Sequence, residues 1–106
     1  MEEVLHILTE NGCAAGDHIV NGKVEDRDRV DFLSAYMREC RQAITEGVNL
    51  KGYFVWSFLD NFEWSQGYDK RFGLHYVDYK TGERIPKSSA RWYKRVIQKN
   101  GLSDTP

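Results

Sequence analysis

The chain has 106 residues, enough for one domain, and 41% hydrophobic and 29% charged residues are typical of a globular protein rather than a disordered one. Its 15 Lys and Arg residues against 16 Asp and Glu residues give a net charge of −1, so no basic field is present to attract nucleic acid or an anionic membrane. No apolar stretch approaches the length of a membrane span, and the acidic start Met1-Glu2-Glu3 is unlike a signal peptide.

The two cysteines, Cys13 and Cys40, do not have the spacing of metal ligands, and we interpret both as free thiols. Free thiols are typical of a reducing compartment, so the sequence favours a cytoplasmic location without establishing one. We expect neither a metal nor an organic cofactor.

Two short apolar runs, residues 4–8 and 52–58, have the length of buried parallel strands. The first ends at the turn signal Glu10-Asn11-Gly12. Between the two runs, about residues 26–46 are predicted to form an amphipathic helix. Asp26 or Asp28 can cap its start, and Gly47 stands where a helix-ending glycine belongs. The apolar side chains that recur every three or four residues are Leu33, Tyr36, Met37, Cys40 and Ile44.

A hairpin is predicted from residues 73–78 and 83–85. Ser88 or Ser89 can cap a last helix that ends at Asn100-Gly101. The predicted apolar face of this helix consists of Ala90, Tyr93, Val96 and Ile97.

The order strand, helix, strand, hairpin, helix predicts an α/β fold with a parallel sheet. Two such units cannot close a barrel, and they leave strand edges without partners. We therefore expect a piece of a larger fold, with residues 1–102 in its domain and residues 103–106 as a flexible tail.

Glu10 directly follows the first apolar run. Catalytic groups collect at the carboxyl ends of strands in α/β barrels, and a carboxylate there can act as the nucleophile in glycoside hydrolysis. From the residues alone, an ordinary turn acid is the commoner interpretation.

The segment from Trp56 to Trp64 places two indoles and two carboxylates in nine residues. Indole faces suit the apolar C–H face of a pyranose, and carboxylates accept hydrogen bonds from its hydroxyls. Core packing of Trp56 and solvent exposure of Glu63 are the competing interpretations.

Residues 4–101 resemble glycoside hydrolase family 1, the β-glucosidase family. The resemblance rests on Thr9-Glu10-Asn11-Gly12 and on Trp56-Ser57 with Asp60-Asn61-Phe62-Glu63-Trp64. It continues through Gly67-Tyr68, Arg71-Phe72-Gly73 and Val77-Asp78-Tyr79. The strand before Thr9 is one residue longer than the family pattern, which predicts a bulge or an altered register there.

This resemblance implies that the chain is the C-terminal part, the last two βα units, of a (β/α)8 TIM barrel. It implies that Glu10 is the catalytic nucleophile of a retaining enzyme, and that Trp56 forms the platform of the −1 sugar site. Glu63 and Trp64 would contact the sugar hydroxyls, and Phe72 would line the same pocket. A cis peptide bond between Trp56 and Ser57 is also implied.

Other residues near these motifs are predicted to have structural roles. We expect Asp60 and Asn61 to brace their loop rather than contact a substrate, and Arg71 to pair with a nearby acid.

A retaining glycosidase also needs an acid/base carboxyl group, which in this family lies in an Asn-Glu-Pro motif earlier in the chain. No Asn-Glu-Pro occurs in the 106 residues. The leading hypothesis is therefore hydrolysis of β-glucosides by a full-length enzyme, with this chain inactive alone and dependent on the missing N-terminal barrel portion. Because the Glu63 carboxylate would repel a phosphate, we expect a non-phosphorylated glycone.

Two alternatives stay open at this point. The first is a non-catalytic carbohydrate-binding member, or an inactive fragment, of the same scaffold. The second is an unrelated small α/β interaction domain, which the two motifs disfavour.

Overall fold

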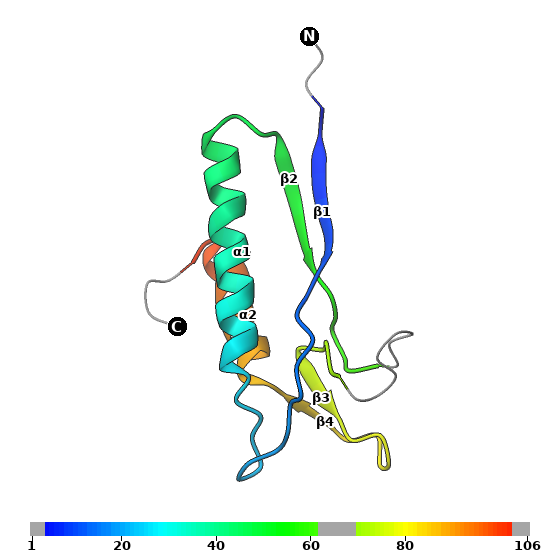
Figure 1. Cartoon of the computed structure of the whole chain (residues 1–106). Coiled ribbons are helices and arrows are strands. Elements are labelled where there is room, and N and C mark those ends of the chain that lie inside the picture. The colour runs from blue at the N-terminus through cyan, green and yellow to red at the C-terminus, as the bar shows by residue number, and fades with distance from the viewer. Residues whose placement is uncertain (1–3, 62–69, 103–106) are drawn as a thin grey trace.

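The structure, a computed structural model, describes residues 4–61 and 70–102. It contains the predicted order of strand, helix, strand, hairpin and helix (Figure 1). The elements are β1 (His6–Asn11), α1 (Arg27–Thr45), β2 (Leu50–Val55), β3 (His75–Val77), β4 (Arg84–Pro86) and α2 (Ser88–Lys99). None of the helices in the described ranges is both long and apolar enough to span a membrane.

β1 and β2 pair in parallel and are joined through α1, so the predicted parallel unit is confirmed (Figure 1). The register is irregular after His6 and after Leu8, which confirms the predicted irregularity in the first strand. The strand bounds differ from the prediction at both strands. β1 continues through Glu10 to Asn11, and β2 ends at Val55.

The helix ends follow the predicted positions, but the predicted capping side chains are wrong. Asp26 occupies the N-cap position of α1 without capping it, because its carboxylate binds Arg29 and Ser89 instead. Lys87, rather than a serine, precedes α2. Gly47, at φ 102°, follows the C-cap of α1, and Asn100 ends α2 in a left-handed conformation, as predicted.

The core lies between the first turns of α1, the start of the β3–β4 hairpin, and α2. It consists of Val30, Leu33, Leu74 and Trp92. Leu33 belongs to the predicted apolar face of α1, whereas Tyr36 and Ile44 from the same face are about half exposed. Trp92 was not part of the predicted face of α2. It is buried because it faces α1 and Leu74, while Ile97 is mostly exposed.

The β1–β2 sheet is not buried, contrary to the prediction for its two apolar runs. Val4, Leu5, Ile7 and Phe54 are each more than half exposed. Within the described residues β1 and β2 pair only with each other, so the other side of each strand lacks a neighbour. The radius of gyration is 15.3 Å, against about 13 Å for a compact domain of this length. The chain therefore has the extended form of a barrel segment.

Candidate active site

Glu10 is the second-last residue of β1, and it is exposed. Its backbone has φ 59°, a left-handed conformation that is uncommon for residues other than glycine. Two residues later, a Cβ on Gly12 would stand 2.2 Å from the carbonyl oxygen of Trp56. Only glycine allows the chain after Glu10 to pass this close to Trp56.

Hydrogen bonds hold the ends of β1 and β2 together at this point. The Trp56 N–H donates to the Asn11 carbonyl oxygen at 2.9 Å. The Tyr53 hydroxyl donates to the side-chain oxygen of Asn11, and burial raises the pKa of that hydroxyl well above its usual range. Glu10 and Trp56 therefore stand at adjacent strand ends, which is the juxtaposition that the two motifs predicted.

Trp56 is 39% exposed, so the competing interpretation as a core residue does not hold within the chain. The peptide bond between Trp56 and Ser57 is cis, as predicted. Ser57 bridges to the next part of the site. Its N–H donates to the Phe72 carbonyl oxygen at 3.3 Å, and its own carbonyl oxygen accepts from the Leu74 N–H at 2.9 Å.

Phe72 is half-buried beside this bridge, so the structure brings together three of the predicted site residues, Glu10, Trp56 and Phe72. Glu63 and Trp64, the other two, lie outside the described residues.

Asp60 braces its loop, as predicted. Its side chain is fully buried and accepts from the N–H groups of Gly73 and Val77 at 3.0 and 3.3 Å. It also forms an ion pair with Arg71 at 2.7 Å, so Asp60 is the nearby acid with which Arg71 was predicted to pair. The Arg71 guanidinium stacks over the rings of Tyr76 and Tyr79.

A network of buried ion pairs behind the site was not predicted. Within the described residues it joins six side chains of alternating charge, in the order Asp26, Arg29, Asp17, Lys87, Asp60 and Arg71. Burial works to raise the pKa of Asp17, but hydrogen bonds from Arg29 and Lys87 outweigh it and lower that pKa. The same contacts outweigh burial at Arg29 and raise its pKa.

The spacing of Asp26 and Arg29 at the start of a helix was the available sequence signal for this network. The other pairings join residues 11 to 70 positions apart, which no local pattern reveals.

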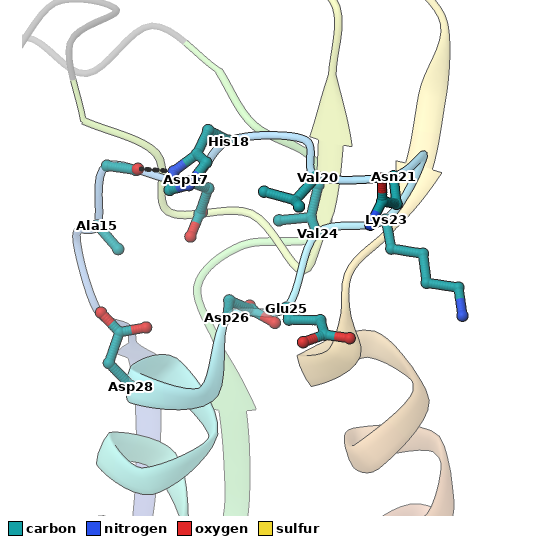
Figure 2. A pocket seen from close by; sticks show the side chains of 11 residues that line it. Ala15, Asp17, His18, Val20, Asn21, Lys23, Val24, Glu25, Asp26 and Asp28 are labelled. Carbon is teal, nitrogen blue, oxygen red and sulfur yellow. Dashed lines mark hydrogen bonds between the residues drawn. The ribbon is translucent and has the colours of Figure 1, made fainter.

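A hollow of about 580 Å³ lies along residues 15–28, beside the same network (Figure 2). Acidic side chains line it, including Asp17, Glu25, Asp26 and Asp28. The Asp17 and Asp26 carboxylates are already bound to Arg29, and no group of His, Cys, Asp and Glu among the described residues is arranged to hold a metal ion. The hollow therefore offers no second candidate site.

Comparison with known proteins agrees with this geometry. The model of "Glycosyl hydrolase family 1" matches residues 2–102. The chain is 56% identical to "1,4-beta-D-glucan glucohydrolase" of Thermotoga neapolitana and 55% identical to "Beta-glucosidase A" of Thermotoga maritima, over 98 residues in each case. Each match covers 92% of this chain and 22% of the relative, so the chain spans about a fifth of the relatives' length.

Solved structures give the same result. A family 1 β-glucosidase from Thermotoga maritima matches with a TM-score of 0.88 and 56% identity, over 91% of this chain and 22% of that one. The same enzyme matches in its complexes with castanospermine, at a TM-score of 0.88, and with deoxynojirimycin, at 0.87. The chain superimposes on a portion of a (β/α)8 barrel, and it belongs to glycosyl hydrolase family 1.

Proposed function

We propose that this chain supplies the nucleophile and part of the glycone site of an enzyme that hydrolyses β-glucosides with retention of configuration. The observation that carries the proposal is the placement of Glu10 beside Trp56, at adjacent ends of two parallel strands, through the hydrogen bond between Asn11 and Trp56. Relatives named β-glucosidases, and complexes of such a relative with sugar mimics, support the choice of substrate.

In this proposal the Glu10 carboxylate attacks the anomeric carbon and forms a covalent glycosyl ester, while the bond to the leaving oxygen breaks. A second carboxyl group protonates that oxygen and later takes a proton from the water that hydrolyses the ester. The indole of Trp56 forms the floor under the sugar, and Phe72 closes one side. Glu63 and Trp64 bind its hydroxyls, and the Glu63 carboxylate disfavours a phosphorylated glycone.

The second carboxyl group belongs to the remainder of the barrel, since the chain has no Asn-Glu-Pro motif. General acid–base catalysis contributes about 10²–10⁴-fold, and the other half of the glycone site is also missing. We therefore propose that the chain is inactive alone and acts together with the N-terminal barrel portion.

A chimera tests this proposal. The matching segment of the Thermotoga maritima β-glucosidase is replaced by residues 4–102 of this chain, and hydrolysis of an aryl β-glucoside is measured. We expect turnover by the chimera and its loss in Glu10→Gln, with folding intact. Glu83→Gln, on the exposed hairpin, is the matched control. A 2-fluoro glycoside should label Glu10.

Labelling at another carboxylate, or full turnover by Glu10→Gln, would contradict the role of Glu10. Turnover by the purified 106-residue chain would contradict its dependence on the rest of the barrel.

A further inference from the structure

Lys87 has no part in the proposed mechanism. Its side chain is fully buried, at the junction of β4 and α2. Its ammonium donates to Asp17 Oδ2 at 2.6 Å and to Asp60 Oδ1 at 2.8 Å. Burying a lysine costs free energy unless its charge is paired. Here two carboxylates pair with the ammonium group.

The two carboxylates belong to the two loops that leave the candidate site. Asp17 lies in the loop that follows Glu10, and Asp60 lies in the loop that follows Trp56. Asp60 is itself tied to the segment of Phe72 through Arg71 and the Gly73 N–H. One ammonium group thus connects the chain segments of all three described site residues.

The backbone of Lys87 is anchored independently of its side chain. Its N–H donates to the Leu74 carbonyl oxygen at 3.0 Å, and the next N–H, of Ser88, donates to the Val24 carbonyl oxygen at 3.0 Å. Because Val24 lies in the same loop as Asp17, the ammonium is held next to this loop and connects it to Asp60 of the other loop.

We propose that Lys87 is a positioning residue that sets the spacing between the nucleophile Glu10 and the sugar platform Trp56. This inference rests on the proposed function. Without the ammonium, the Asp17 and Asp60 side chains lose the donor that they share, so the two loops can shift relative to each other, and in the single variant the two buried carboxylates also repel each other. The other ends of the network remain paired, Asp17 with Arg29 and Asp60 with Arg71.

The test must separate positioning from charge balance, because Lys87→Met leaves an uncompensated buried carboxylate and lowers stability for that reason alone. In Lys87→Met/Asp17→Asn the network is neutral again and the ammonium tie between the loops is absent, while the hydrogen bonds of Arg71 to Ala15 and Arg29 remain. Lys80→Met, at the exposed hairpin turn, is the control. The three variants are made in the active chimera, and thermal unfolding, hydrolysis of an aryl β-glucoside and binding of deoxynojirimycin are measured.

We expect Lys87→Met to lose both stability and activity. The double variant should regain the unfolding midpoint of the control, while its kcat/KM and its affinity for deoxynojirimycin stay at least tenfold below the control. Equal activity and affinity in the double variant and the control would overturn the inference, since Lys87 would then serve charge balance alone.

If the Met variants do not fold, Lys87→Gln/Asp17→Asn provides the comparison, because the network is again neutral and the amide at position 87 can still donate to Asp60. A loss of kcat/KM in this folded variant supports the inference, and unchanged values overturn it. An unmodified chimera without turnover refutes the proposed function itself. A chimera that is active and sensitive to Glu10→Gln but indifferent to every Lys87 substitution refutes the positioning role only.

Discussion

The loop end of the molecule, made of the loops at the carboxyl ends of β1 and β2, differs from the β1–β2 sheet in how far its side chains find partners within the chain. At the loop end, the ion-pair network is buried, and no buried side-chain nitrogen or oxygen among the described residues lacks a hydrogen-bond partner. In the sheet, apolar side chains such as Ile7 and Phe54 face solvent. The buried polar groups are thus satisfied within the chain, whereas the apolar surface of the sheet is left exposed.

This contrast follows from the range of the two kinds of interaction. A buried charge needs a partner within hydrogen-bond distance, and each of the six network residues has one within this chain. Apolar burial is non-directional and proportional to area, so any neighbouring strand or helix can supply it.

Removing a cation from the ion-pair network should cause the largest loss of stability at the loop end. In the chimera, Arg29→Met should lower the free energy of unfolding by about 3–5 kcal/mol, because Asp26 and Asp17 lose their partner in a buried region. Arg27→Met is the matched control. Arg27 pairs with Asp31 at 3.1 Å, but both side chains are more than 60% exposed, and such a pair contributes about 0–1 kcal/mol. Denaturant titration of both variants measures the difference, and equal losses would contradict the contrast.

The sheet should respond only when its neighbours are present. Phe54→Ala in the chimera should cost about 3 kcal/mol, since the ring would be covered by the rest of the barrel. In the isolated chain, where Phe54 is 61% exposed, the same change should leave unfolding unaffected and reduce self-association. Chemical denaturation and size-exclusion chromatography give the two results. A large loss of stability in the isolated chain would show that it buries the ring by itself.

Acid should weaken the loop end first. The pKa of Asp17 is lower in the folded chain than its ordinary value of 3.8, so the folded state binds a proton there less readily than the unfolded state. The stabilisation is complete above the ordinary value and is lost as the pH falls through the folded value. Unfolding midpoints measured from pH 6 downward should therefore fall more steeply for the parent chimera than for Asp17→Asn. Parallel curves would contradict this.

The smallest effect concerns the junction of the two regions, where Tyr53 donates to Asn11. Tyr53→Phe should cost about 1 kcal/mol at neutral pH, the net value of one hydrogen bond. Burial raises the pKa of Tyr53 above its ordinary value of 10.0, so its stabilising contribution is complete below that value and is lost as the pH rises above it. The difference in unfolding midpoint between parent and variant should thus shrink in alkali. A constant difference would show that the hydroxyl is not buried.

The elements were predicted well because each is marked locally. Gly47 and Asn100 stand at the predicted helix ends, and the bulged strand was predicted from one extra residue before Thr9. The predicted serine caps of α2 and the carboxylate cap of α1 were wrong for one reason. Asp26 binds Ser89 across the fold and Arg29 within the first turn of α1, and these contacts replaced the capping hydrogen bonds.

The family, the order of the elements, and the placement of Glu10 and Trp56 at neighbouring strand ends were predicted from the sequence, because motifs and periodicity are properties of neighbouring residues. Three features of the folded chain were not predicted: Trp92 rather than Ile97 enters the core, the apolar strands are exposed, and Lys87 joins Asp17 to Asp60. These features depend on contacts between residues as many as 70 positions apart in the sequence. The sequence around a charged residue or a tryptophan does not indicate which distant residue it will contact.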